Sequence, residues 1–379
     1  MKSWLFASLA FLLVNISQLS NVATGQDPDL RLTLPSEVFA VPGVPSRIYF
    51  DNIVLTQTPQ NFRYEVACDI GESRADHWTV IPDDHQVGQH NLTVTVHSEQ
   101  NKTLASASTV FTVVPRSAGS DIQEPINLLI IGDSLTHASA YPNQIARLLS
   151  EPHNPPWRML GSHKPASAAD GVFHEGYGGW TWDRFATKYE SDPDGTYRKR
   201  SSPFVFLDTN NDAAIDMPRY FESHCDGQPP EYIVIMLGIN DCFGAPPDDL
   251  KAIDARIDSV FGHADTLLAA IQLAAPKAEI GLCLTPPPNS RQSAFQANYK
   301  DNYTRWGWKR IQHRLVERQL DYVAKKADLR MTVVPTQLNL DPIDGYPDNN
   351  GVHPNTAGYN QIGTTVYSWL KWRLASTLH

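Results

Sequence analysis

Three short polar motifs bring together the side chains that acyl transfer requires. They are Gly132-Asp133-Ser134-Leu135, Gly238-Ile239-Asn240-Asp241 and Gly351-Val352-His353-Pro354-Asn355. A serine can act as nucleophile, an asparagine amide can stabilise an oxyanion, and a histidine can act as general base. Each motif alone has an ordinary alternative, as a helix cap, a turn or a structural histidine. Their combination favours a nucleophilic serine.

The elements around these motifs predict an α/β fold. The apolar runs 126–131 and 232–237 directly precede the first two motifs, and the third precedes a helical stretch over 356–374. Runs 279–284 and 331–334 add two strands, and 142–151, 248–275 and 293–328 add three helical stretches. Alternating strands and helices predict a parallel sheet with helices on both faces. Loops at the carboxyl ends of such strands meet at one edge, so the motifs should come together.

The region before this pattern has a different periodicity. Residues 27–118 contain short alternating segments, such as His90-Asn-Leu-Thr-Val-Thr-Val-His, separated by turn signals. Alternation with period two predicts a small, antiparallel, immunoglobulin-like all-β sandwich. The polar segment 116–125 contains Gly and Pro, so we place the boundary there, with the α/β domain over 122–379.

Residues 1–25 carry the features of a signal peptide. Lys2 precedes an apolar run over 4–14, and Ala23-Thr24-Gly25 is suited to cleavage. The run is shorter than the ~20 residues that a bilayer span needs. We therefore expect a secreted or periplasmic protein without membrane insertion, the alternative being a buried N-terminal helix.

Composition excludes several classes of protein. The 379 residues are 41% hydrophobic and carry a net charge of -10, which disfavours nucleic acid as a partner. Four cysteines are too few for a disulfide scaffold, and Cys242 with Cys283 is the pair we would expect if any forms. Segment 208–219 faintly resembles a calcium loop but has Ala213 and Arg219 where Gly and Glu belong. We expect no metal and no cofactor.

The three motifs resemble blocks I, III and V of the SGNH/GDSL hydrolases. His174-Glu-Gly-Tyr-Gly-Gly-Trp-Thr181 resembles block II, in the version common among secreted carbohydrate esterases. The resemblance covers roughly residues 125–375. It implies a flavodoxin-like, three-layer SGNH hydrolase domain that cleaves esters without a metal. The Gly-x-Ser-x-Gly elbow of the α/β-hydrolases is absent.

Roles for individual residues follow from this resemblance. Ser134 would attack the ester carbonyl, and His353 would take its proton and pass it to the leaving alcohol. The oxyanion hole would consist of the N–H groups of Ser134 and Gly176 and the side chain of Asn240, with Gly178 as the alternative to Gly176. Asp133 and Asp241 are expected to brace the loops.

One position departs from the family pattern. The residue three places before His353 is Asn350, where the family has Asp. Asparagine can orient the imidazole but cannot stabilise imidazolium by charge. Three alternatives follow: Asn350 orients His353, Asp348 reaches the ring instead, or the protein is a weak catalyst.

The substrate expectation rests on aromatic residues beside the block II glycines. Tyr177, Trp180 and Trp182 could stack on sugar rings, or they could pack in the core under the loop. We predict a serine esterase that hydrolyses O-acyl esters of carbohydrates, specifically O-acetyl esters, through an acyl-enzyme. The alternatives are a lysophospholipase or general acyl-ester hydrolase, a catalytically weak glycan-binding protein, and an acyltransferase, which differs only in its acceptor.

Overall fold

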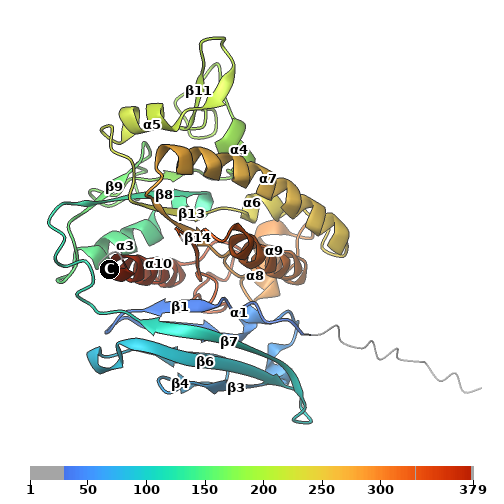
Figure 1. Cartoon of the computed structure of the whole chain (residues 1–379). Helices are drawn as coiled ribbons and strands as arrows, with labels where there is room; N and C mark the ends of the chain where they lie inside the picture. The colour runs from blue at the N-terminus through green and yellow to red at the C-terminus, as the bar shows by residue number, and fades with distance from the viewer. Residues whose placement is uncertain (1–29, 329, 377–379) are drawn as a thin grey trace, which may run out of the picture.

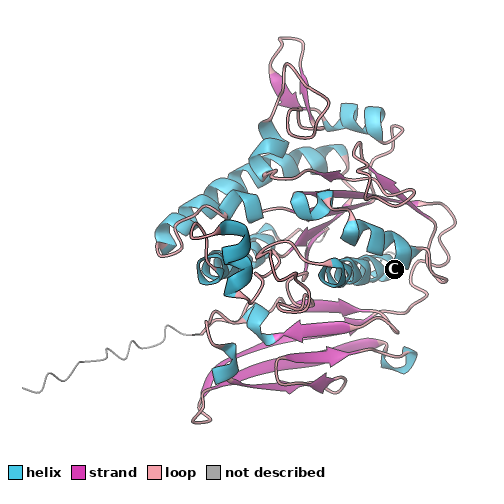
Figure 2. Ribbon diagram, turned by 180° about the vertical axis from the view of Figure 1, so that it is seen from behind, coloured by secondary structure: helices cyan, strands magenta, loops and turns pink. Residues whose placement is uncertain are grey.

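A computed structural model of the chain describes residues 30–328 and 330–376 (Figure 1). The predicted signal peptide, residues 1–25, lies outside the described residues. In the described part, a strand-rich N-terminal region lies against a larger region of mixed helices and strands, and Figure 2 shows the same arrangement from behind. None of the helices in this part combines the length and apolar character needed to cross a bilayer.

A six-stranded parallel sheet forms the centre of the larger region. Its strand order is β10-β8-β13-β14-β15, and β9 pairs with the first half of β8 while β10 pairs with its carboxyl end. The bounds are β8 Ile126–Gly132, β9 Trp157–Leu160, β10 Glu175–Gly176, β13 Tyr232–Met236, β14 Glu279–Cys283 and β15 Met331–Val334. All pairings are parallel, which confirms the predicted α/β class.

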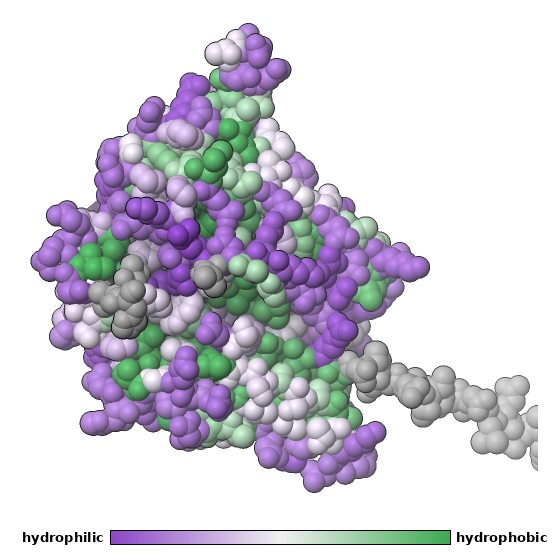
Figure 3. All heavy atoms as spheres, in the orientation of Figure 1, coloured by the Kyte–Doolittle hydropathy of each residue, from purple (hydrophilic) through white to green (hydrophobic). Residues whose placement is uncertain are grey.

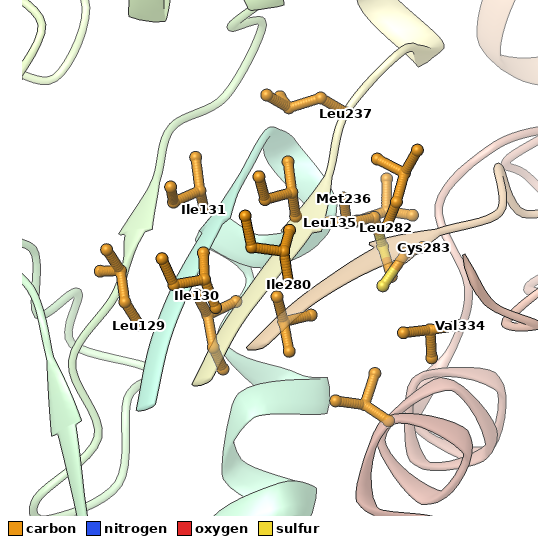
Figure 4. Close-up of a cluster of buried hydrophobic side chains, with 14 of the residues drawn as sticks. Leu129, Ile130, Ile131, Leu135, Met236, Leu237, Ile280, Leu282, Cys283 and Val334 are labelled. Atoms are coloured by element: carbon orange, nitrogen blue, oxygen red, sulfur yellow. The ribbon is translucent and has the colours of Figure 1, made fainter. Parts of the chain in front are cut away.

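The central strands are continuous apolar runs because both faces of the sheet are covered. Figure 4 shows Ile131 of β8 and Leu282 of β14, which the strand register places on one face of the sheet, whereas Ile130 belongs to the opposite face. Helices α3 (Ala140–Leu149) and α10 (Thr356–Ser376) lie on the side of the sheet that faces the N-terminal region, and α7 (Leu250–Ala274) lies on the opposite side (Figure 1). The remaining helices of this region are α2 Ser134–His137, α4 Trp182–Thr187, α5 Met217–His224, α6 Ile239–Cys242, α8 Gln292–Tyr299 and α9 Arg305–Lys326, and a short hairpin is formed by β11 Val205–Leu207 and β12 Ala213–Ile215.

Two details of this region differ from expectation. The helical stretch predicted over 293–328 is two helices, because Lys300 adopts φ 55° and Thr304 caps a new helix by accepting from the N–H of Gly307. The pair of Cys242 and Cys283 does not form a disulfide, and both are buried free thiols. Burial raises the pKa of Cys242 to about 12, so this thiol is unreactive at neutral pH.

The N-terminal region contains two small sheets around one apolar core. One has the order β1-β7-β6-β3 and the other β2-β5-β4. The bounds are β1 Glu37–Ala40, β2 Ser46–Tyr49, α1 Phe50–Ile53, β3 Arg63–Ala67, β4 Glu72–Ser73, β5 His77–Val80, β6 Gly88–His97 and β7 Thr103–Val113. Strand β1 pairs with β7 in parallel, so the region is not wholly antiparallel as expected. Both strands lead into residues buried in the larger core, Val41 and Val114, which explains their shared direction. The immunoglobulin-like assignment and the domain boundaries stay predictions.

The two regions share their cores. Leu338, from the C-terminal part of the chain, is buried in the core of the N-terminal sheets. Phe39 of β1 stacks on Trp372 of α10 with ring centroids 4.2 Å apart. The side-chain amide of Asn52 donates to the carbonyls of Gln337 and Leu340, each at 2.7 Å. The N-terminal region is therefore packed against the segments that follow β14 and β15.

Candidate active site

Ser134 lies at the carboxyl end of the central strand β8. It is the first residue of α2, and the carboxylate of Asp133 caps this helix by accepting from the N–H of Leu135 at 3.0 Å. A Cβ atom at Gly132 would lie 1.9 Å from Thr136 Oγ1, so only glycine allows the chain to turn this tightly after the strand. Strand and turn together present the Ser134 hydroxyl at the edge of the sheet.

His353 contacts this hydroxyl from the turn that precedes α10. Its Nε2 atom lies 2.8 Å from Ser134 Oγ, although the two residues are 219 positions apart. Burial lowers the pKa of His353 below the ordinary value for histidine. A neutral imidazole at this distance can accept the hydroxyl proton, which is the geometry that a nucleophile and its base require.

Asn350 is the side chain that contacts His353 Nδ1. Its Oδ1 atom accepts from the N–H groups of Val352 at 3.0 Å and His353 at 2.9 Å, and lies 3.3 Å from His353 Nδ1. Asp348 instead is 90% exposed at its side chain and lies 3.6 Å from Arg291 Nε. The alternative in which Asp348 reaches the ring is wrong in this structure. With Nδ1–H directed to Asn350, Nε2 is left free to accept a proton from the serine.

Asn240 lies in α6, which follows β13, the strand that pairs with β8. This short helix begins directly after Gly238, whose φ of 125° only glycine adopts readily. Asn240 Nδ2 donates to the carbonyl of Trp180 at 3.0 Å. The amide has a second N–H, which is available to a substrate oxygen. Asp241 braces the same loop, as expected, since its Oδ1 atom accepts from the N–H of Trp182 at 3.0 Å.

The structure contradicts Gly176 as an oxyanion donor. Gly176 belongs to β10, where it is buried and pairs with Gly132. Its N–H donates to His174 Nδ1 at 3.1 Å and is therefore already engaged. It is a glycine for a packing reason, because a Cβ atom there would lie 2.5 Å from the Thr136 side chain.

The turn that follows β10 offers better donors. Within the described part of the chain, no hydrogen bond engages the N–H groups of Ser134, Gly178 or Gly179. Gly179 has φ 76° and is exposed, and the next residue, Trp180, accepts from the amide of Asn240. Gly178 was the alternative to Gly176 in the sequence analysis, whereas Gly179 was not considered. The sequence feature that could have indicated it is the Gly178-Gly179 pair, which permits a turn with an exposed backbone.

The aromatic residues of this loop are buried. Tyr177 and Trp180 are each 0% exposed and Trp182 is 3% exposed. Ring centroids lie 4.6 Å apart for Tyr177 and Trp180, and 4.8 Å apart for Trp180 and Phe185. The prediction that they bind sugar is wrong, and core packing under the loop is correct. The loop folds back so that its side chains enter the core while its glycine backbone stays outside.

A different aromatic group was missed by the sequence reasoning. Phe243 follows Asn240 by three residues, which places both on one face of a helical turn. Its ring lies 4.4 Å from that of Tyr303 and 5.1 Å from that of Tyr299, centroid to centroid. Phe243 and Tyr299 are half-buried and Tyr303 is 36% exposed. The adjoining helix α8 packs on the turn that carries His353, since a Cβ atom at Gly351 would lie 2.6 Å from the Phe295 ring.

A second group of rings follows Ser134 along α2. His137, three residues after the serine, is half-buried and packs against Tyr197 with ring centroids 4.5 Å apart. Its Nδ1 atom lies 2.9 Å from His163 Nε2. Burial lowers the pKa of His137 and lowers that of His163 to about 4, so both rings are neutral at pH 7.

Two carboxylic acids are buried behind the serine. Burial raises the pKa of Asp133 and of Asp241 to about 7 each. The Oδ2 atom of each is buried without a hydrogen-bond partner, while the Oδ1 atom accepts a backbone N–H. Their surroundings therefore favour the protonated acid.

No group of three or more His, Cys, Asp or Glu side chains in the described residues is arranged to hold a metal ion. Within the segment 208–219, residues 208–212 form a turn in which Asp208 accepts from the N–H groups of Asn210 and Asp212, and β12 and the start of α5 follow. The Asp208 carboxylate therefore stabilises an exposed turn.

Comparisons with known proteins identify the family to which the chain belongs. The model of the GDSL-like lipase/acylhydrolase family matches residues 130–361. No curated protein sequence matches the chain. Among solved structures, a family 3 carbohydrate esterase from Talaromyces cellulolyticus is 18% identical with a TM-score of 0.40, covering 66% of this chain and 99% of that one.

Two structures from Clostridium thermocellum are similarly distant. A family 3 carbohydrate esterase is 16% identical with a TM-score of 0.44, covering 68% of this chain and 100% of that one. A family two carbohydrate esterase, solved with cellohexaose, is 14% identical with a TM-score of 0.38, covering 88% of this chain and 90% of that one.

Proposed function

The chain belongs to the GDSL-like lipase/acylhydrolase family, the SGNH hydrolases, and is a carboxylic ester hydrolase; on this premise we propose that it removes O-acyl groups, specifically O-acetyl groups, from carbohydrates through an acyl-enzyme. The observation that carries the proposal is the 2.8 Å contact between His353 Nε2 and Ser134 Oγ. It supports the proposal because the imidazole lies within hydrogen-bond distance of the Ser134 hydroxyl.

The reaction would proceed in two halves. His353 Nε2 takes the proton of Ser134 as Oγ attacks the ester carbonyl, and the oxyanion accepts hydrogen bonds from the N–H of Ser134, the amide of Asn240 and an N–H of the Gly178-Gly179 turn. His353 then gives its proton to the leaving alcohol as the C–O bond breaks. In the second half His353 takes a proton from water as the water oxygen attacks the acyl carbonyl. It then returns this proton to Ser134 Oγ as the acyl–Oγ bond breaks, which releases the acid and restores Ser134.

Asn350 would hold the ring in the required tautomer. Because its side chain is neutral, the imidazolium formed during attack is stabilised by orientation and hydrogen bonding and not by a carboxylate. More of the transition-state stabilisation must then come from the oxyanion side, where each donor is typically worth about 3–4 kcal/mol.

A carbohydrate leaving group is supported by the rings beside the site. Phe243, Tyr299 and Tyr303 are partly exposed and lie between the Asn240 helix and the His353 turn. Aromatic faces suit the apolar faces of sugar rings. The described exposed hydrophobic side chains are scattered along the chain (Ile81, Val87, Tyr189, Leu250, Leu273, Tyr303, Ile343), and the face in Figure 3 mixes hydrophobic and hydrophilic residues. A long lipid chain would need a continuous apolar surface.

The first experiment compares hydrolysis of p-nitrophenyl acetate by the wild type and by Ser134→Ala. Loss of activity in the variant supports the serine esterase, and equal rates contradict it. A panel of acetylated sugars and long-chain esters then tests the substrate class, because a preference for long-chain esters would favour the lysophospholipase alternative.

The aromatic group gives a sharper test of carbohydrate binding. Tyr303→Ala should raise KM for acetylated oligosaccharides several-fold and leave KM for p-nitrophenyl acetate unchanged. Tyr189→Ala is the matched control, since Tyr189 is 41% exposed and belongs to the segment after α4.

Secretion or periplasmic export also stays part of the proposal, and detection of a mature chain lacking residues 1–25 would support it.

A further inference from the structure

Asn289 clamps the turn that carries Asn350. It follows the three prolines 286–288 after β14, and it is 0% exposed. Its amide Nδ2 donates to the carbonyls of Pro347 and Asn350, each at 3.0 Å. Its backbone N–H donates to the carbonyl of Gly351, also at 3.0 Å. A single buried residue thus holds both ends of the turn from which Asn350 reaches His353.

The next residue ties this clamp to the N-terminal region. Ser290 Oγ donates to Asp51 Oδ2 at 2.6 Å, and the Ser290 N–H donates to the carbonyl of Pro342 at 2.7 Å. Asp51 lies in α1, between the two N-terminal sheets and the larger region. It also accepts from Lys309 Nζ at 3.0 Å and from Arg305 at 3.2 Å, both in α9.

The Asp51 group is buried and charged. The side chains of Asp51 and Lys309 are 11% and 1% exposed. Burial acts to raise the pKa of Asp51, but Lys309, Arg305 and the Ser290 hydroxyl outweigh it and lower that pKa. Buried ion pairs add little net stability compared with apolar packing, and their best-attested use is to specify one arrangement. The arrangement specified here is the position of Ser290, and with it Asn289.

We infer that Asn289 is a positioning residue for His353, and that the N-terminal region, through Asp51 and Ser290, is part of the active-site scaffold. This inference rests on the proposed function of Ser134 and His353. The connection runs from Asp51 through Ser290 and Asn289 to Asn350, and from there to the imidazole. It gives the N-terminal region a role in catalysis that requires no contact with substrate.

The test compares Asn289→Ala with Asn339→Ala. Asn339 is a matched control because it is 5% exposed and its amide also donates to a backbone carbonyl, that of Gln361 at 3.2 Å. We expect Asn289→Ala to lower kcat for p-nitrophenyl acetate about 10–100-fold, since a misplacement of about 1 Å typically costs about 10²-fold. KM should stay within about twofold, because the clamp does not touch substrate.

The pH profile separates positioning from stability. Loosening the turn admits water around His353, so its pKa rises towards the ordinary value and the acid limb of kcat/KM moves to higher pH. Asn339→Ala should lower the unfolding temperature without moving this limb. A folded Asn289→Ala with wild-type kcat and acid limb would overturn the inference.

A second pair of variants serves if Asn289→Ala does not fold. Ser290→Ala removes the hydroxyl that contacts Asp51 and should lower kcat a few-fold with the same shift of the acid limb, whereas Ser290→Thr keeps the hydroxyl and should retain the wild-type profile. Wild-type behaviour of a folded Ser290→Ala would overturn the link to the N-terminal region. Full activity of Ser134→Ala would instead defeat the proposed function, so the two failures are distinguishable.

Discussion

The two sides of Ser134 are built in different ways. On the proposed oxyanion side, Asn240 and the Gly178-Gly179 turn follow strands of the central sheet, and hydrogen bonds between neighbouring loops hold them. On the base side, His353 lies on a turn outside the sheet, and Asn350 and Asn289 hold it. The oxyanion side is therefore a local product of the sheet, whereas the base side depends on segments distant in the chain.

The two sides also differ in their ionisable groups. The oxyanion side has two buried carboxylic acids, Asp133 and Asp241, whose pKa values burial raises to about 7. The base side has an amide, Asn350, where a carboxylate would stabilise imidazolium. We therefore expect the base side to contribute to catalysis by orienting the imidazole, and the oxyanion side by presenting preorganised dipoles to the developing negative charge.

The largest effect is expected from the base itself. His353→Gln removes the imidazole that lies 2.8 Å from Ser134 Oγ. General base catalysis typically contributes about 10²–10⁴-fold, and kcat for p-nitrophenyl acetate should fall by about 10³-fold or more. Single-turnover kinetics with a matched concentration of Ser134→Ala would show whether both variants reach the same residual rate. A loss below tenfold would mean that His353 is not the base.

The oxyanion side should give the next largest loss. Asn240→Ala removes one donor and should lower kcat about 10²–10³-fold, with a smaller change in KM, because the bond strengthens as charge develops on the oxygen. The amide also holds the Trp180 carbonyl. Circular dichroism and urea unfolding must therefore show that the variant retains its fold. If KM instead rises by the same factor and kcat stays unchanged, Asn240 contributes to ground-state binding.

The same contrast explains what could be predicted from sequence. Ser134 and Asn240 closely follow short apolar runs that are typical of buried parallel strands. The pattern of these runs therefore predicted that both residues lie at the same edge of the sheet. The predictions that Gly176 donates to the oxyanion and that the aromatic residues bind sugar were wrong. The length of β10 and the direction in which the following loop folds back depend on packing against Thr136 and Phe185. Nothing local to that segment indicates which faces turn inward.

The base side was predictable only in part. His353 was identified by its place before the last helix, but the choice between Asn350 and Asp348 required the geometry of the turn. That geometry depends on Asn289, about 60 residues earlier, and on Asp51, about 240 residues earlier than Ser290. Hydrogen bonds of such sequence separation leave no pattern in a single sequence.

Asn350→Asp tests the charge difference between the two sides. A carboxylate beside Nδ1 stabilises imidazolium, so kcat at pH 8 should rise, up to about tenfold if charge limits the rate. The same charge raises the pKa of His353, since it favours the protonated ring, and the acid limb should move to higher pH. Asn350→Ala should lower kcat instead. If Asn350→Asp leaves both kcat and the limb unchanged, orientation alone is what this position supplies.

The last prediction concerns the stability of the oxyanion side and not the rate. Because the pKa of Asp241 is raised to about 7 in the folded protein, the folded state holds a proton between about pH 4 and 7 that the unfolded chain has released. The contribution of this group to stability is then greatest below about pH 4 and falls as pH rises to about 7.

Asp241→Asn keeps the oxygen that accepts from Trp182 and removes the ionisation. Relative to wild type, the variant should gain stability between pH 4.5 and 8, by up to a few kcal/mol, since one pKa unit corresponds to ~1.4 kcal/mol. Urea unfolding at both pH values measures this difference, with the exposed Asp121→Asn as control. Parallel curves for wild type and Asp241→Asn would mean that the acid is already ionised in the folded state, and that the oxyanion side carries a buried negative charge behind the serine.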